Sequence, residues 1–240
     1  MDVLKVRVDN LTKKEILEKI EFFLSEEKFH QIATVNPEFI LEAQKNERFR
    51  EILNETDLNV ADGIGIGYAF LRYGKLLKNR FAGVDLMHEV LKIANEKKLG
   101  VYLVINKNGL SKYEEVKDAL KRHYPEVLFK GEDIDIESHQ SSAVSHQALA
   151  LGSEIVFCNF GSPYQEIFLD QLKNGNIQLA MGVGGSFDFV TEKIRRAPKF
   201  LRKVGLEWLW RLMIQPWRLR RIVNAVFVFP LKIIAEKNHE

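Results

Sequence analysis

The sequence predicts an α/β protein with a Rossmann-like, mainly parallel sheet, helices on both of its faces, and a C-terminal helical appendage. Short β-branched apolar runs alternate with amphipathic segments about seven times along the chain, which is the pattern of successive βαβ units. Several apolar runs stop at Asn, Asp or Gly and pass directly into a helical pattern, as buried parallel strands do at their carboxyl ends. Because the composition shifts near Lys193, we expect a core at residues 1–193 and an appendage at residues 194–240.

The elements of the predicted core follow from local patterns. Thr12 and Glu15 have the spacing of a capping box, which predicts a helix after them. Pro37 suits a first helical turn and predicts a helix that continues to about residue 53. Other helices are expected after Gly63, over residues 85–97, after Gly109, over 142–151 and after Pro163. The expected strands are 3–8 (an edge), 31–35, 58–61, 101–105, 127–130, 155–160 and 179–183.

Composition limits the class of protein. Of 240 residues, 46% are apolar and 28% are charged, which is typical of a globular chain and argues against disorder. The single cysteine, Cys158, excludes an internal disulfide, and its place in an apolar strand predicts a packing role. The N-terminus lacks a secretory pattern, and no apolar run has the ~18–20 residues that span a bilayer. We therefore expect a cytoplasmic protein.

The charge is distributed unevenly. Residues 193–240 hold 12 Lys and Arg against 3 Asp and Glu, whereas residues 1–192 hold 23 against 30. All three tryptophans lie in the basic segment, where basic residues alternate with Trp, Phe and Leu at helical spacing. This pattern favours a helix pair in a lipid interface and predicts an anionic membrane surface as a partner. A C-terminal helix docked on the core or at a subunit contact, as in a homo-oligomer, is the alternative. The long aliphatic content disfavours nucleic acid as a partner.

The stretch Asn59-Val-Ala-Asp62-Gly63-Ile-Gly65-Ile-Gly67 is the strongest functional signal. Ligands of open α/β sheets bind where strands end and helices begin. Asp62 is a carboxylate at such a strand exit, with glycines behind it that allow a ligand to approach the backbone. The pattern predicts acid–base chemistry at Asp62.

Other strand exits carry polar residues or glycines that the sheet would bring to the same edge. They are Thr34 and Asn36, Gln165 after the 155–160 strand, and Gly184, Gly185 and Asp188 after the 179–183 strand. A glycine-lined crevice that faces helix N-termini favours a phosphate or diphosphate. Arg80 follows the Asp62 helix and is placed to offer a bidentate fork to the same diphosphate.

Several alternatives remain open from the residues alone. Asn36 and Asp62 can instead be plain N-caps, in which case the protein is a non-catalytic scaffold at a membrane surface. Gly63-Ile-Gly65-Ile-Gly67 partly matches the dinucleotide fingerprint of a nicotinamide-dependent oxidoreductase, but Tyr68 occupies the place of the third glycine. Asp133-Ile-Asp135 matches a metal-binding pattern of sugar transferases, yet its acidic loop favours a solvated charge run. His and Cys residues show no metal-ligand spacing, so no metal is expected.

The motifs along the chain also resemble those of the WecG/TagA/CpsF glycosyltransferase family, and most closely its TagA branch in wall teichoic acid synthesis. The resemblance covers nearly the whole chain, in order. The matching runs are Thr34-Val-Asn36-Pro37, Ala61-Asp62-Gly63-Ile-Gly65, Arg80-Phe-Ala-Gly83-Val-Asp85-Leu-Met87, Gly161-Ser-Pro163-Tyr-Gln165-Glu166, Gly182-Val-Gly184-Gly185-Ser-Phe187-Asp188 and Arg196-Ala-Pro198 followed by Gly205-Leu-Glu207-Trp208.

The resemblance implies an inverting transferase without a metal or other cofactor. Such an enzyme moves N-acetylmannosamine from a UDP-sugar donor to the 4-hydroxyl of N-acetylglucosamine on undecaprenyl diphosphate. Relatives that use N-acetylmannosaminuronic acid or another UDP-sugar are the alternatives. By resemblance, Asp62 is the base, Thr34 and Asn36 lie near the sugar, and Arg80 faces the donor diphosphate. Gln165, Gly184, Gly185 and Asp188 match the nucleotide side, and Arg211, Arg218 and Arg221 match arginines that close over the site at the inner face of the membrane.

Overall fold

The computed structural model describes residues 1–136, 152–173 and 176–237, and these form the α/β fold that the sequence predicts. Within these ranges, six parallel strands make one sheet in the order β4-β3-β8-β7-β5-β6. The strands are β3 (His30–Val35), β4 (Leu58–Ala61), β5 (Gly100–Asn106), β6 (Leu128–Ile134), β7 (Ile155–Cys158) and β8 (Leu179–Gly182). The helix predicted over residues 142–151 lies outside the described residues.

Helices cover both faces of this sheet because alternate residues of each buried strand point to opposite sides. Ile32 packs on one face with α1 (Lys13–Phe23), α5 (Gly83–Lys97) and α6 (Tyr113–Lys121). Its neighbour Ala33 packs on the other face with α2 (Pro37–Ala43), α3 (Glu47–Glu55) and α4 (Ile64–Arg72). Cys158 is a buried free thiol on that second face, beside α8 (Tyr164–Asp170), which confirms its packing role.

Three predicted elements need correction. The 3–8 segment is not an edge strand of the main sheet but a separate hairpin of β1 (Asp2–Val3) and β2 (Val6–Arg7), because Leu4 and Lys5 adopt positive φ and turn the chain. The helix after Pro37 is two helices, since the Asn46 side chain accepts from the backbone N–H of Phe49 and caps α3. The 127–130 strand extends through the acidic segment as β6.

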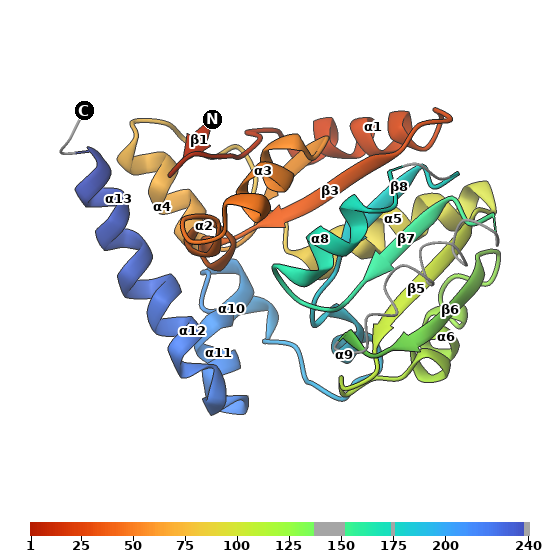
Figure 1. Ribbon diagram of the computed structural model, residues 1–240. Coiled ribbons are helices and arrows are strands. Elements are labelled where there is room, and N and C mark those ends of the chain that lie inside the picture. Colours follow the sequence, from red (N-terminus) through yellow and green to blue (C-terminus); the bar gives the residue numbers. More distant parts are fainter. Residues whose placement is uncertain (137–151, 174–175, 238–240) are drawn as a thin grey trace.

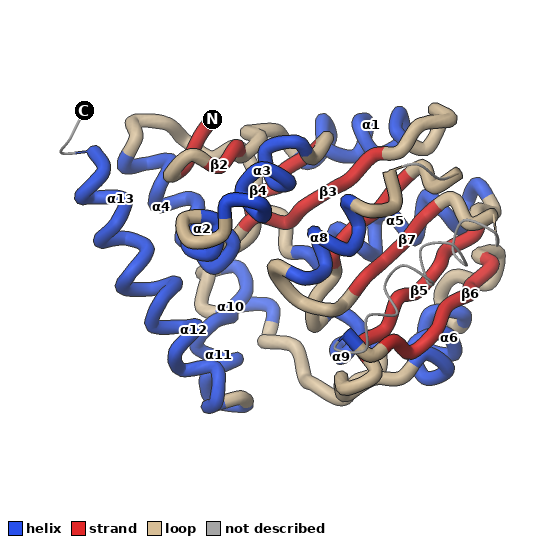
Figure 2. The backbone as a smooth tube through the Cα atoms, in the orientation of Figure 1, coloured by secondary structure: helices blue, strands red, loops and turns tan. Residues whose placement is uncertain are grey.

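The C-terminal appendage is a set of short helices beside the sheet (Figures 1 and 2). The core ends with the short helix α9 (Ser186–Val190). The appendage begins with α10 (Lys199–Lys203) and α11 (Glu207–Ile214). A helical column follows, made of η2 (Pro216–Arg218), α12 (Leu219–Val223), η3 (Asn224–Val228) and α13 (Phe229–Lys237). Pro230 does not interrupt this column. The π turn of η3, in which the Phe229 N–H donates to the Asn224 carbonyl, adjusts the backbone just before the proline.

The last helix docks on the core. Phe229 and Ile233 are fully buried against α2 and α4, and the Tyr73 hydroxyl donates to Glu236. The expectation of a purely interfacial helix pair is therefore wrong for this face of α13. Other faces of the appendage remain exposed and apolar, with Trp217 73% exposed. No helix in the described ranges is long and apolar enough to cross a bilayer.

Candidate active site

The carboxyl ends of β3, β4, β7 and β8 open into a cavity of about 930 Å³ that the appendage helices close from the opposite side. Asp62 lines it directly after β4, and its side chain is only partly exposed. Gly63, at φ +86°, makes the turn from β4 into α4, a backbone conformation that L side chains rarely adopt. Asp62 makes no N-cap to α4, because Gly63 is the capping residue, so the capping alternative is wrong for Asp62.

The surroundings of Asp62 raise the pKa of its carboxyl group to about 6. Desolvation by burial is the largest cause, and it is opposed by the charge of Arg211. Glu207 raises the pKa further, whereas the backbone N–H of Gly83, which donates to the carboxylate, and the charge of Arg80 lower it. A carboxylate with a pKa near 6 is ionised at neutral pH and still accepts a proton readily, so it suits general-base work.

Thr34 and Asn36, at the end of β3, line the cavity and also have structural roles. The Asn36 side chain accepts from the backbone N–H groups of Glu38 and Phe39 at 2.9 and 3.1 Å, so it is an N-cap to α2. Thr34 is buried, and its Oγ1 lies 3.1 Å from the position that a Cβ on Gly83 would occupy. The hydroxyl is therefore held close to the α5 N-terminus that also faces Asp62.

Gln165 joins the two glycine turns on the other side of the cavity. Its Oε1 accepts from the backbone N–H of Gly161 at 3.1 Å and from that of Gly184 at 3.0 Å. Its Nε2 donates to Glu166 Oε1 at 2.6 Å. Burial raises the pKa of Glu166 to about 8, which keeps this carboxyl group neutral at pH 7. The Gln165 amide thus fixes the loops after β7 and β8.

Asp188 and Arg218 meet near the second glycine turn. Ser111 donates to Asp188 Oδ1 at 2.7 Å, which orients that carboxylate at the start of α9. Arg218 Nη2 lies 4.0 Å from the position of a Cβ on Gly185. Burial and the neighbouring charges of Arg211 and Arg221 lower the pKa of Arg218 to about 10. The Arg218 guanidinium therefore lies in a part of the cavity wall that already carries the positive charges of Arg211 and Arg221.

The predicted arginines come from separate elements and converge on the cavity. Arg80 donates to the Arg202 backbone carbonyl at 2.7 Å, which ties the core to α10. Arg211 stacks over the Phe189 ring, with 4.8 Å from its guanidinium carbon to the ring centroid. Arg221 pairs with Glu38 of α2, with 2.7 Å from Nε to Oε2. Among the residues that the structure describes, six arginines and one lysine line the cavity together with five acidic residues.

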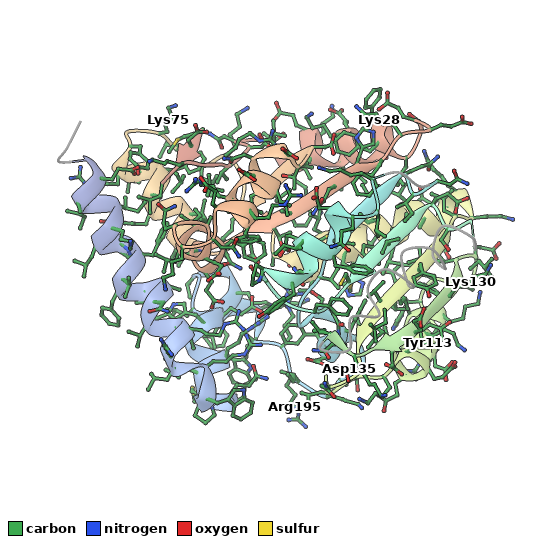
Figure 3. All side chains as sticks on the ribbon, in the orientation of Figure 1. Lys28, Lys75, Tyr113, Lys130, Asp135 and Arg195 are labelled. Atoms are coloured by element: carbon green, nitrogen blue, oxygen red, sulfur yellow. The ribbon has the colours of Figure 1, made fainter. Side chains whose placement is uncertain are left out.

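Asp85 and Arg196 form an ion pair in the site that was not predicted from the sequence. Arg196 donates to both carboxylate oxygens of Asp85 at 2.6 and 2.7 Å, and both residues line the cavity. Burial opposes ionisation of Asp85, but the hydrogen bonds and charge of Arg196 outweigh it and hold the pKa of that carboxyl below its usual range. Arg196 Nε also lies 3.8 Å from Glu207. Next to it, Arg195 points outward from the loop before α10 (Figure 3).

Two motif alternatives lose their support. Gly65 and Gly67 of the partial dinucleotide fingerprint lie inside α4 rather than in a phosphate loop, and a Cβ on Gly65 would lie 2.5 Å from Pro37 Cγ. Asp133 belongs to β6, at the sheet edge opposite β4, and accepts from the backbone N–H of Tyr113 at 3.0 Å. Within residues 1–136, 152–173 and 176–237, no cluster of three or more His, Cys, Asp or Glu has a metal-binding arrangement.

Comparison with known proteins assigns the family. A sequence profile of the Glycosyl transferase WecG/TagA/CpsF family matches residues 1–240. The chain is similar to proteins named N-acetylglucosaminyldiphosphoundecaprenol N-acetyl-β-D-mannosaminyltransferase in three bacteria. The protein of Bacillus spizizenii is 33% identical over 221 residues, covering 91% of this chain and 82% of the relative. That of Staphylococcus aureus is 30% identical over 240 residues (99% and 93%), and that of Bacillus subtilis 29% over 210 (87% and 80%). The chain therefore belongs to the WecG/TagA/CpsF family of glycosyltransferases.

Proposed function

We propose that this chain is an N-acetylmannosaminyltransferase that uses a UDP-sugar donor and N-acetylglucosaminyl-diphospho-undecaprenol as acceptor. Relatives that align with most of the chain carry the name of this reaction. The single structural observation that carries the proposal is Asp62, a carboxylate with a pKa raised to about 6 at the mouth of the sheet, facing a cavity rich in arginine. Such a pairing fits a hydroxyl nucleophile on one side and an anionic leaving group on the other.

In the proposed reaction, the acceptor's 4-hydroxyl oxygen forms a bond with the anomeric carbon of the donor sugar. The Asp62 carboxylate takes the hydroxyl proton as that bond forms, which contributes rate acceleration of about 10²–10⁴-fold. The bond between the anomeric carbon and the UDP oxygen breaks on the opposite face, so the configuration inverts. Thr34 and Asn36 line the wall between the base and the glycine turns, where the donor sugar would lie.

The leaving diphosphate gains negative charge as the bond to the sugar breaks. We assign its stabilisation to Arg80, Arg211 and Arg218, because arginine forks match diphosphate oxygens and all three line the cavity. The Gly184–Gly185 turn, which the hydrogen bond from the Gly184 N–H to Gln165 holds in place, would lie beside the nucleotide. Asp188 lies on the same side. Because cations of the chain supply the charge, we expect transfer to need no metal.

A transfer assay tests this proposal. Purified protein is incubated with UDP-N-acetylmannosamine and a diphosphate-linked N-acetylglucosamine acceptor, with and without a chelator, beside a panel of other UDP-sugars. The proposal predicts a disaccharide product from the N-acetylmannosamine donor, formed equally in the presence of chelator. Faster transfer from another UDP-sugar would show that N-acetylmannosamine is not the donor sugar. A loss of transfer with chelator would refute metal independence. No transfer from any donor would refute the proposed function.

We further propose that the appendage rests on the inner face of the cell membrane, where a lipid-linked acceptor is located. The helices α11, η2, α12, η3 and α13 expose apolar side chains that the core does not cover, and basic residues flank them. They include Met213, Trp217, Leu219, Phe227 and Leu231. Flotation with anionic liposomes tests this: we expect Trp217→Ser with Phe227→Ser to weaken binding, and unchanged binding would refute the proposal.

A further inference from the structure

A second cavity of about 600 Å³ lies beside α4, outside the cavity that contains Asp62. One wall is α4 itself, the opposite wall is the C-terminal end of α10, and the loop after α4 closes the side. Its lining combines apolar side chains and glycines with the cations Lys78 and Arg80. These residues are Gly63, Ile64, Gly67, Tyr68, Leu71, Leu77, Lys78, Asn79, Arg80, Val204 and Gly205.

The α4 wall is an apolar stripe that faces solvent. Ile64, Tyr68 and Leu71 stand at positions i, i+4 and i+7, so they lie on one side of the helix. All three are exposed, with Leu71 65% exposed. A different face of α4 carries the buried contact with α13, which also lies beside α4 in Figure 1. The stripe is therefore an apolar surface of α4 that its docking on the core leaves open.

The two cavities are adjacent and share a wall. Gly63, Ile64, Arg80 and Gly205 line both of them. The chain at Gly205 passes close to α4, since a Cβ there would lie 2.7 Å from Ile64 Cδ1 and its φ is +80°. Arg80 stands at the junction and donates to the Arg202 carbonyl at 2.7 Å. A ligand with its polar head at this junction can thus place an apolar tail along the second cavity.

The order of the strands decides which substrate that ligand is. The glycine turns assigned to the donor follow β7 and β8, whereas Asp62 follows β4, the edge strand. In an inverting displacement the nucleophile attacks from the face opposite the leaving group, so the acceptor approaches from the side of Asp62 that is away from those turns. α4 and the second cavity begin at that side, directly after Gly63.

We propose that the second cavity holds the isoprenoid units of the acceptor nearest to its diphosphate, with Lys78 available to the phosphates. This inference rests on the proposed function and adds a binding site for the lipid part of the acceptor. The lining fits such a ligand, because it combines the cation Lys78 with apolar side chains. From Ile64 to Leu71 the stripe is about 10 Å long, so it covers only the start of a long polyprenyl chain.

A pair of water-soluble acceptors tests the site without a membrane. N-acetylglucosaminyl diphosphate esters of farnesol and of methanol are compared in detergent-free buffer, below the concentration at which the farnesyl ester forms micelles. The wild-type enzyme should show a KM for the farnesyl ester that is lower by roughly tenfold or more. Leu71→Gln should raise only that KM, several-fold, and leave kcat/KM for the methyl ester unchanged. Leu128→Gln, at an exposed leucine on β6, is the matched control and should change neither.

The outcomes separate the two proposals. Equal KM values for both esters in the wild type, or equal effects of Leu71→Gln and Leu128→Gln, overturn the lipid site while the transferase function stands. No transfer to either ester overturns the proposed function, and the lipid site falls with it.

A binding measurement that needs no turnover gives a second check. Because Cys158 is buried, Leu71→Cys and Leu128→Cys each provide one exposed thiol among the described residues. Farnesyl diphosphate should slow maleimide labelling of the Leu71→Cys variant and not of the Leu128→Cys variant, whereas inorganic diphosphate should slow neither. Labelling of Leu71→Cys that farnesyl diphosphate leaves unchanged overturns the lipid site.

Discussion

The pH dependence of transfer follows from the surroundings of Asp62. We predict that kcat/KM falls as the pH is lowered through about 6, because burial raises the pKa of this carboxyl group to about 6 and only its ionised form accepts a proton. About nine-tenths of the carboxyl groups are ionised at pH 7 and about one-tenth at pH 5, so kcat/KM should drop roughly tenfold between them. With the ordinary aspartate pKa of 3.8, the loss of kcat/KM at pH 5 would be less than about a tenth.

Two variants should shift this acid limb, the fall of kcat/KM at low pH, in opposite directions. Glu207→Gln removes a charge that raises the pKa of Asp62, so its limb should shift to lower pH. Arg211→Gln removes a charge that lowers the same pKa, so its limb should shift to higher pH, whatever its effect on the maximum rate. Glu51→Gln makes the same chemical change on exposed α3, away from the cavity, and should leave the limb in place.

The assay is the initial rate at low concentrations of a water-soluble acceptor, from about pH 5 to 8.5 at constant ionic strength. UDP binding at each pH shows that the protein stays folded. A profile that is flat down to about pH 5, or Glu207→Gln and Arg211→Gln limbs that coincide with the wild type, would refute the assignment of the limb to Asp62.

Three further variants test other parts of the structure. Arg218→Ala should weaken UDP binding by roughly tenfold or more in calorimetry, whereas Arg195→Ala, whose side chain points outward, should not; equal effects would remove Arg218 from the diphosphate site. The free energy of unfolding of Glu166→Gln, measured relative to that of the wild type by thermal unfolding, should rise between about pH 6 and 8. The rise should be up to about 1.4 kcal/mol per pH unit. The sign follows because a folded pKa raised to about 8 gives stability that is full below the unfolded value and is lost as the pH rises; parallel stability curves would contradict it. Phe229→Ala removes a fully buried ring and should weaken the docking of α13 on the core by about 3–5 kcal/mol. Amide hydrogen exchange over residues 216–237 should therefore become faster, and unchanged exchange would contradict this.

The sheet and the edge at which the site lies were predictable because both leave local signals. Buried parallel strands read as apolar runs, and residues such as Asp62 and Gly184 follow them directly. The hairpin at the N-terminus was not predictable in this way, since Leu4 and Lys5 adopt positive φ without being glycines. The split between α2 and α3 depends on one cap, Asn46, inside a continuous apolar periodicity.

The rest of the site depends on contacts between distant parts of the chain. Asp85 and Arg196 are 111 residues apart, and neither has a local pattern that reveals its partner. Docking of α13 on the core was the alternative and not the favoured prediction, because Phe229 and Ile233 belong to an apolar run whose opposite side stays exposed, and composition does not separate the two sides. Pro230 predicts a break in the helix, but the π turn directly before it allows the helix to continue.

Replacement of Asp62 by asparagine tests the central claim most directly. Asp62→Asn keeps the size of the side chain and removes the base, so transfer should fall by about 10²–10⁴-fold, and UDP should still bind with the wild-type affinity because the arginine side of the cavity is intact. The low residual rate should also no longer follow a group with a pKa near 6. An Asp62→Asn enzyme that transfers sugar at the wild-type rate, with the wild-type pH profile, would contradict the account.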